Sequence, residues 1–301
     1  GRTVKLDRQA DIAKIDQSLA KFRAVVIVGP SGCGKTALAK NFAEMKMPVA
    51  KVIWWNARDF SQTSFQVFET HLGLRHTLVD LLDGVRDEEA YVIVDGLDRN
   101  YLDHVYDHLA SLIHLLRLNE GEGAWRLMVT CNVDSWGDVD ERLRRRNVQD
   151  FEWGPVIIKE PSETELKAVW EVVPALRRLV LRPSLRPILF KPRIIDMLAI
   201  KMEAGVNVDT SGWVGESDLI QWYWETDVQK APDGTARSAF LQKLAERQAD
   251  RSEPETPESV FAPADLTVAE GLKGDRICRV IDGCLSFDHD IIGDWARQRV
   301  L

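Results

Sequence analysis

The octapeptide Gly-Pro-Ser-Gly-Cys-Gly-Lys-Thr at residues 29–36 limits most narrowly how this chain can fold. It follows the β-branched run Ala24–Val28, which predicts a buried parallel strand, and a helical pattern begins at Lys35. In the pattern G-x-x-x-x-G-K-T, small residues let backbone N–H groups converge on phosphate oxygens, and the helix that follows adds the positive end of its dipole. The segment therefore predicts a phosphate-binding loop in an α/β fold with a parallel sheet.

The loop and the first helical turn supply most of the predicted nucleotide contacts. The Lys35 ammonium is expected to reach the β- and γ-phosphates of ATP, and the Thr36 hydroxyl is expected to bind Mg²⁺. The predicted nucleotide-binding residues here are Gly29, Pro30, Ser31, Gly32, Cys33, Gly34, Lys35, Thr36 and Ala37. ATP or ADP with Mg²⁺ is the ligand set that this motif implies.

A phosphate-binding loop of this kind needs an acid on a neighbouring strand to hold the magnesium ion, and Asp95 is placed to provide it. Asp95 ends the apolar run Tyr91–Val94, and Asp98 follows three residues later. We predict that Asp95 holds Mg²⁺ and that Asp98 polarises the attacking water. A turn, or the N-cap of a helix over Tyr101–Leu118, is the alternative role for Asp98.

Further strands are predicted at Val49–Asn56, at Trp125–Asn132 and from residue 151 to Glu160. Polar groups at the carboxyl ends of parallel strands face the ligand crevice, so Asn132 is a candidate sensor of the γ-phosphate. An Asx turn that opens the next loop is the alternative. The arginines of residues 144–146 stand where some ring-forming ATPases carry a trans-acting arginine, although a solvated helix end is our default interpretation.

After residue 160 the pattern becomes mainly helical. A capping box of Ser162 and Glu165 opens one amphipathic helix, and another helix starts at about Pro192. Later segments predict two amphipathic helices (residues 217–229 and 236–250), a hairpin at Asp282-Gly283 and a final helix from Asp288 to Leu301. We therefore predict a P-loop domain over residues 1–157, a helical lid over residues 158–208 and a winged-helix-like domain over residues 209–301.

The charge and the composition of the chain argue against some classes of partner. The formal net charge of -8 over 301 residues argues against a general nucleic-acid binder. No apolar run approaches the length of a membrane span and the N-terminus lacks a signal-peptide pattern, so a cytoplasmic location is expected. The cysteines have no zinc-binding spacing, which suits reduced thiols. The chain begins at Gly1 without an initiator Met, so we expect a fragment of a longer protein.

The order of these motifs resembles the nucleotide-binding core of STAND ATPases, which include the NACHT and NB-ARC modules of immune receptors and bacterial antiviral sensors. The segments that carry the resemblance are Val25–Thr36, Val92–Asp98 and Phe287–Ile292. The resemblance implies that Asp95 and Asp98 are paired Walker B acids and that Pro192 packs on adenine. It also implies that Leu6 and Arg8 line the base. NB-ARC proteins often show Thr-Thr-Arg where this chain has Thr-Cys-Asn at residues 130–132, so the arginine that reads the γ-phosphate is absent.

The same resemblance gives a role to His289, which stands in a Phe-Asp-His-Asp sequence similar to the Met-His-Asp signature. It implies that the imidazole approaches the β-phosphate of ADP. A hydrogen bond of this charge-assisted kind contributes about 1.5–3 kcal/mol. Moving a switch from 1:99 to 99:1 takes roughly 5.5 kcal/mol, so His289 would act together with other contacts. A surface histidine or a satisfied core histidine is the alternative.

The resemblance implies a regulatory ATPase in signalling or immune defence. Such a switch is closed with ADP, oligomerises with further copies of itself when ATP binds, and hydrolyses ATP slowly. The alternative is a DNA-handling AAA+ ATPase of the origin-recognition type, whose winged helix grips a duplex. A P-loop kinase for a small molecule ranks third, because it does not account for the winged-helix pattern.

Overall fold

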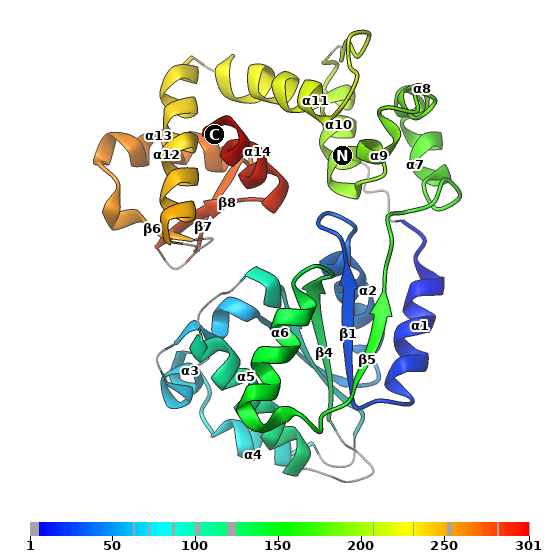
Figure 1. The fold of residues 1–301 in the computed structure, drawn as a ribbon, viewed down its shortest axis with the longest axis vertical. Coiled ribbons are helices and arrows are strands. Elements are labelled where there is room, and N and C mark those ends of the chain that lie inside the picture. Colours follow the sequence, from blue (N-terminus) through cyan, green and yellow to red (C-terminus); the bar gives the residue numbers. More distant parts are fainter. Residues whose placement is uncertain are drawn as a thin grey trace. The chain divides into compact units, whose positions relative to one another are not determined.

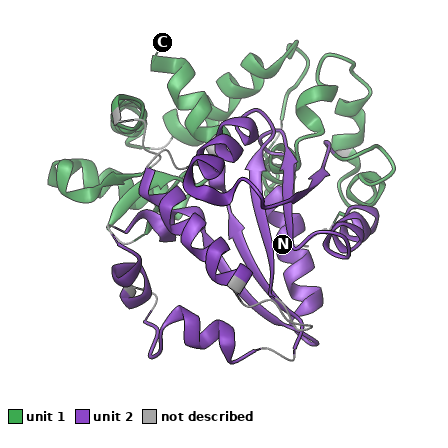
Figure 2. Ribbon diagram, turned by 60° about the horizontal axis from the view of Figure 1, so that its bottom comes forward, with its two compact units in different colours: residues 1–6, 161–301 green, residues 7–160 purple. Residues whose placement is uncertain are grey.

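The computed structural model describes residues 6–62, 64–71, 73–85, 88–99, 103–118, 125–206, 208–230, 232–251, 255–281 and 283–300. The chain divides into two compact units, named as in Figure 2: unit 2 comprises residues 7–160, and unit 1 comprises residues 1–6 and 161–301. The boundary lies three residues beyond the predicted end of the P-loop domain at residue 157. The further division of unit 1 into a lid and a winged-helix-like domain stays a prediction.

Unit 2 is built on a parallel five-stranded sheet with the strand order β2-β3-β4-β1-β5. Figure 1 labels β4, β1 and β5 side by side in that order. Its strands are β1 (Ala24–Gly29), β2 (Lys51–Asn56), β3 (Ala90–Asp95), β4 (Trp125–Asn132) and β5 (Trp153–Ile157). Every residue of β1 and β3 is buried, as expected for parallel strands that are covered on both faces. Because β4 lies between β1 and β3, the expectation that the acid stands on the strand next to the loop strand is wrong.

Helices cover both faces of this sheet. They are α1 (Gln9–Leu19), α2 (Lys35–Lys46), the 3-10 turn η1 (Ala57–Ser61), α3 (Phe65–His71), α4 (Leu78–Asp83), the 3-10 turn η2 (Leu97–Arg99), α5 (Asp103–Leu118), α6 (Trp136–Leu143) and the π-helical turn η3 (Arg144–Val148). Helices α1 and α2 pack with Val25 and Ile27 of β1, whereas α3 to α6 pack on the face that carries Val26 and Val28. Successive side chains of β1 therefore enter the hydrophobic cores on opposite faces of the sheet. The predicted P-loop α/β fold is confirmed.

Strands β2 and β5 are both shorter than predicted, and β5 begins at Trp153 and not at residue 151. Strand β2 begins at Lys51 and not at Val49, because the N–H groups of Val49 and Ala50 donate to Lys46 O, each at 2.9 Å, in the turn that closes α2. Strand β5 ends at Ile157 and not at Glu160, because its partner β1 leaves the sheet at Gly29. Helix α5 runs from Asp103, and the predicted first turn at residues 101–102 lies outside the described residues.

Unit 1 is mainly helical and has a small antiparallel sheet of order β6-β8-β7. Its elements are α7 (Lys167–Val172), α8 (Pro174–Val180), α9 (Arg186–Leu189), α10 (Pro192–Glu203), α11 (Glu216–Tyr223), the π-helical turn η4 (Trp224–Gln229), α12 (Gly234–Arg251), β6 (Thr256–Pro257), the 3-10 turn η5 (Glu258–Val260), α13 (Pro263–Gly274), β7 (Cys278–Ile281), β8 (Cys284–Phe287) and α14 (Asp290–Val300). One hydrophobic core runs through these helices, from Leu166 to Ala296. Nowhere in the described ranges does a helix combine the length and apolar character that crossing a bilayer requires.

The hairpin and the start of α10 at Pro192 are confirmed. Gly283 has φ 72°, which glycine adopts readily in such a turn, while its predicted partner Asp282 lies outside the described residues. Helix α13, however, was not predicted.

The predicted helix from Ser162 is wrong in its first turn. The capping box forms, with Ser162 N–H donating to Glu165 Oε2 at 2.7 Å and Glu165 N–H donating to Ser162 Oγ at 3.3 Å, but α7 begins only at Lys167. It ends at Val172 because the next residue precedes Pro174, which disfavours helical backbone angles there. The last helix begins at Asp290, two residues later than predicted.

Helix α10 connects the predicted lid to the rest of unit 1 through ion pairs. Its cations are Arg193 and Lys201, and Lys191 stands at its N-cap. Lys191 pairs with Glu216 of α11 at 3.2 Å, Arg193 pairs with Asp288 at 3.1 Å, and Lys201 pairs with Asp227 of η4. Burial raises the pKa of Asp227, and the hydrogen bond from Lys201 opposes that effect. These pairs and the shared core make unit 1 one packed body.

Candidate phosphate-binding site

Three glycines give the loop of residues 29–36 its shape. A Cβ at Gly29 would lie 2.7 Å from Ile158 O, so no side chain fits there. Gly32 and Gly34 have φ values of 77° and 97°, which other residues adopt only with strain. Gly34 is the N-cap of α2, and no side chain caps this helix. The first backbone N–H groups of α2 can therefore bind ligand oxygens.

Lys35 lies across the start of the loop. Its Nζ donates to Gly29 O at 2.9 Å and to Pro30 O at 3.1 Å. An ammonium group is a compact charge with three donors, so it can bind phosphate oxygens from this position. The predicted contacts of Lys35 with the β- and γ-phosphates stay a prediction.

The magnesium candidates Thr36 and Asp95 are in direct contact. Thr36 Oγ1 lies 2.9 Å from Asp95 Oδ1 and 3.0 Å from Oδ2. Thr130 of β4 adds a second hydroxyl, which donates to Asp95 Oδ1 at 2.7 Å and accepts from Gly96 N–H at 2.8 Å. Asp95 is buried at the carboxyl end of β3, so these two hydroxyls fix a carboxylate that has little access to water.

Thr130 was not among the predicted site residues, although it is a polar residue near the carboxyl end of a strand. It reaches Asp95 because β4 lies directly beside β3. The order of motifs along the chain does not determine the strand order, so it does not predict a contact between Thr130 and Asp95.

The Thr36–Asp95 pair fits Mg²⁺. This ion prefers oxygen ligands, and it is usually held by one or two protein groups together with waters and substrate phosphates. Among the described residues there is no cluster of three or more His, Cys, Asp or Glu side chains that could form a different metal site. When bound, Mg²⁺ would neutralise charge on the β- and γ-phosphate oxygens.

Asp98 and Asn132 meet at the same edge of the sheet. Asp98 Oδ1 accepts the backbone N–H of Asn132 at 2.9 Å, which ties η2 to the end of β4. The Asn132 side chain accepts the N–H of Asp134 at 3.2 Å, so the Asx turn that the sequence left as an alternative does form. Asn132 also lies level with Gly29 in the strand register. The catalytic role of Asp98 and the sensor role of Asn132 stay predictions.

Two buried cysteines belong to the site. Burial raises the pKa of Cys131 to about 12, with a further increase from the Asp98 carboxylate and a decrease from the Lys35 ammonium. Burial also raises the pKa of Cys33. Both groups are therefore neutral thiols near pH 7, and neither is an activated nucleophile.

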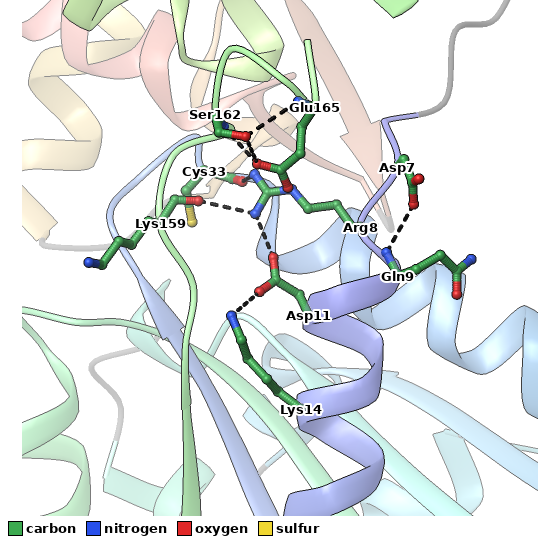
Figure 3. Close-up of polar contacts among 9 residues, drawn as sticks. All are labelled: Asp7, Arg8, Gln9, Asp11, Lys14, Cys33, Lys159, Ser162 and Glu165. Carbon is green, nitrogen blue, oxygen red and sulfur yellow. Dashed lines mark hydrogen bonds and ion pairs between the residues drawn. The ribbon is translucent and has the colours of Figure 1, made fainter. Parts of the chain in front are cut away.

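Arg8 is buried at the base of the loop, and its acceptors include three groups of unit 2 (Figure 3). Nη1 donates to Asp11 Oδ2 at 2.9 Å and to Lys159 O at 3.1 Å, and Nη2 donates to Cys33 O at 3.3 Å. Asp11 also accepts from Lys14 at 2.6 Å. Burial acts to raise the pKa of Asp11, but the hydrogen bonds from Lys14 and Arg8 outweigh it, and the pKa is lowered.

The remaining predicted base contacts lie in unit 1. Leu6 is half-buried and packs against the hydrophobic core of that unit. Pro192 is the first residue of α10, where its missing N–H costs no helical hydrogen bond. The predicted contacts of Leu6, Arg8 and Pro192 with adenine stay predictions.

The Asp-His-Asp sequence before α14 has a local structural role. His289 Nδ1 accepts the N–H of Ile291 at 3.2 Å, and so a neutral ring carries its proton on Nε2. Asp288 pairs with Arg193, as described above. The prediction that His289 approaches ADP stays a prediction.

The arginines after α6 do not behave alike. Arg144 and Arg145 form exposed ion pairs one turn back along the chain, with Asp140 and Glu141, which agrees with a solvated helix end. Arg146 differs, because its side chain is only 19% exposed and pairs with Asp107 of α5. It thereby holds η3 against α5.

Comparison with known families supports the assignment of unit 2. The profile of the ABC transporter family matches residues 12–132, which include the loop, Asp95 and Asn132. Unit 2 is a P-loop ATPase domain. None of the curated proteins matches the sequence.

Several solved structures are similar over nearly the whole chain. A Walker-type ATPase of Pyrococcus abyssi shares 12% identity with a TM-score of 0.47, covering 97% of this chain and 96% of that one. The Aeropyrum pernix ORC2 protein in its ADP form shares 12% identity with a TM-score of 0.47, covering 100% and 96%. Drosophila ORC bound to DNA shares 16% identity with a TM-score of 0.44, covering 97% and 87%.

Proposed function

We propose that this chain is a Mg²⁺-dependent ATPase whose slow hydrolysis regulates unit 1. The observation that carries the proposal is the contact between the Thr36 hydroxyl and the Asp95 carboxylate, next to a loop that carries Lys35. This combination provides donors for phosphate oxygens and oxygen ligands for Mg²⁺ in one place. ATP is the proposed substrate, and ADP and phosphate are the products.

In this proposal each side chain has a defined task. The N–H groups of the loop and the Lys35 ammonium bind the β- and γ-phosphates, and Thr36 and Asp95 hold Mg²⁺. Asp98 orients the attacking water through Oδ2, because Oδ1 is occupied by Asn132 N–H and Oδ2 accepts no hydrogen bond from the described residues. Phosphoryl transfer depends mainly on such positioning and on charge stabilisation.

For unit 1, we propose a switch of the kind that the STAND resemblance implies, in which exchange of ADP for ATP allows copies of the chain to associate. The three ion pairs of the α10 region support the idea that unit 1 responds as one body. His289 would favour the ADP state, and immune or other signalling would be the setting. The test is molar mass by light scattering with ADP and with a slowly hydrolysed ATP analogue. A larger mass with the analogue supports the switch, and the same monomer mass in both states argues against it.

A second candidate is a DNA-handling ATPase of the origin-recognition type. The arrangement that favours it is winged-helix-like, since α13 precedes the β7–β8 hairpin and β6 completes the sheet. However, the charged side chains of α13 are Asp265, Glu270 and Lys273, and Lys273 pairs with Glu270 at 2.8 Å. A helix that reads DNA needs an excess of cations. Duplex binding that weakens steeply with added salt would favour this candidate over the switch.

A further inference from the structure

The buried guanidinium of Arg8 joins three segments that are distant in sequence. Its acceptors include the Asp11 carboxylate on α1, the Cys33 carbonyl in the phosphate-binding loop and the Lys159 carbonyl just after β5 (Figure 3). The chain at Ile158 still follows β1, because Ile158 N–H donates to Val28 O at 2.8 Å. Arg8 therefore connects Cys33, near the end of the loop, to the segment that follows β5, and β5 is the strand that pairs with β1.

The carbonyl of Cys33 matters because of the peptide that it belongs to. In a planar trans peptide the carbonyl of Cys33 and the N–H of Gly34 point in opposite directions. A donor that holds the carbonyl thus fixes the direction of the Gly34 N–H, one of the loop amides. Gly34 has φ 97° and wide backbone freedom, and the hydrogen bond from Cys33 N–H to Pro30 O is long, at 3.4 Å. The loop at this point depends on contacts from outside it.

We infer that Arg8 is a positioning residue of the phosphate-binding loop, which holds the Cys33–Gly34 peptide so that the loop amides are oriented for phosphate before the nucleotide arrives. Preorganised donors bind an anion more tightly because they are not reoriented on binding. This role differs from contact with the adenine base. It rests on the proposed ATPase function, since it assumes that the loop binds phosphate.

The charge of Arg8 alone does not account for this role. Arg8 and Asp11 form an ion pair at 2.9 Å in which both side chains are buried, so the carboxylate offsets part of the charge of Arg8, although Lys14 shares that carboxylate. What remains is the geometry of the guanidinium, whose rigid fork can serve three acceptors at once. A lysine at this position keeps the charge but cannot reproduce the fork. Comparing Arg8→Lys with the wild type therefore separates the effect of the positive charge from the effect of the direction of the hydrogen bonds.

The experiment measures MgADP affinity by calorimetry and ATP hydrolysis by phosphate release. The variants are Arg8→Met, Arg8→Lys, Lys14→Met and Lys35→Ala. Lys14 is the matched control, because it pairs with the same Asp11, and in the described part of the chain no hydrogen bond or ion pair joins it to the loop. We expect Arg8→Met to raise the Kd for MgADP and the KM for ATP about tenfold, as the loss of a charge-assisted hydrogen bond implies, with a smaller change in kcat. Arg8→Lys should lie between Arg8→Met and the wild type, and Lys14→Met should bind as the wild type does.

The possible outcomes are distinguishable. A folded Arg8→Met protein with wild-type Kd and KM overturns the inference, even if its melting temperature without nucleotide is lower, because that pattern belongs to a purely structural residue. If Arg8→Met does not fold, Arg8→Lys decides: a several-fold weaker Kd supports the inference and a wild-type Kd overturns it. Lys35→Ala should lose MgADP binding. If it does not, the proposed function fails, whatever the Arg8 variants show.

Discussion

The Thr36 hydroxyl lies 2.9 Å from Oδ1 of Asp95, although the two residues are 59 positions apart. Strand β1, which leads into the loop before Thr36, and strand β3, which ends in Asp95, are not neighbours. Strand β4 separates β1 from β3, and Thr36 reaches Asp95 from the first turn of α2. The separating strand also contributes, because Thr130 of β4 binds the same carboxylate. The site is thus assembled from three consecutive strands of the sheet.

Replacing Thr130 with Val should destabilise unit 2 and slow ATP hydrolysis. The substitution removes the hydroxyl that orients Asp95 and leaves the buried Gly96 N–H without its acceptor. The expected loss in the free energy of unfolding is about 1–3 kcal/mol, measured by urea denaturation. Thr267→Val is the matched control, because its hydroxyl is exposed and donates to Pro263 O. Equal unfolding free energies for the two variants would contradict the role of Thr130.

Asp98→Asn should retain ATP binding and lose hydrolysis. Asparagine keeps an oxygen that can accept Asn132 N–H, so the link between η2 and β4 survives, but the charge that orients the water is gone. Phosphate release and MgATP affinity are measured together, with Asp134→Asn as an exposed control at the same edge of the sheet. Phosphate release equal to that of the wild type would reject the catalytic assignment of Asp98.

Asp11 should make the stability of unit 2 depend on pH. Its pKa in the folded protein is lowered, so it contributes stability above its unfolded pKa of about 4, and this contribution is lost as the pH falls through the folded value. The difference in unfolding free energy between the wild type and Asp11→Asn should therefore be largest at neutral pH and shrink in acid. Urea denaturation at a series of pH values measures it. A difference that does not change with pH would show that Asp11 acts without its charge.

His289 allows a test that separates a helix cap from a nucleotide contact. Its Nδ1 caps the start of α14, and asparagine can also cap a helix. If His289 retains ADP, as the STAND resemblance implies, both His289→Ala and His289→Asn should release ADP faster in stopped-flow displacement. If it only caps the helix, His289→Ala should lower the melting temperature, His289→Asn should not, and the ADP off-rate should be that of the wild type in both variants.

Local patterns in the sequence predicted the elements of unit 2 well. Buried parallel strands are continuous apolar runs, and the octapeptide marks its own strand and helix. The strand over Ala24–Val28, the strand Trp125–Asn132 and the start of α2 at Lys35 therefore follow from the residues alone. The strand order did not follow, because it depends on pairing between distant segments. The position of β4 beside β3, and with it the role of Thr130, became visible only in the structure.

The Arg8 network shows the same limit in the site. The residues around a single arginine before a helix do not show whether its side chain contacts the base or positions the loop. Two of its acceptors, at Cys33 and Lys159, are backbone carbonyls, which every residue has and which therefore leave no signature in the sequence. Helix α13 was missed because it contains Gly271 within its span, and glycine is a poor helix former. In each case the deciding interaction lies between segments or in the backbone.

The most direct test of this account is Mg²⁺-dependent phosphate release by the wild type, Asp95→Asn and Lys35→Ala, each confirmed as folded by circular dichroism. We expect slow release of phosphate from ATP by the wild type, none when Mg²⁺ is removed with EDTA, and none by either variant. Hydrolysis by Asp95→Asn at the wild-type rate would contradict the claim that Thr36 and Asp95 form the magnesium site of an ATPase.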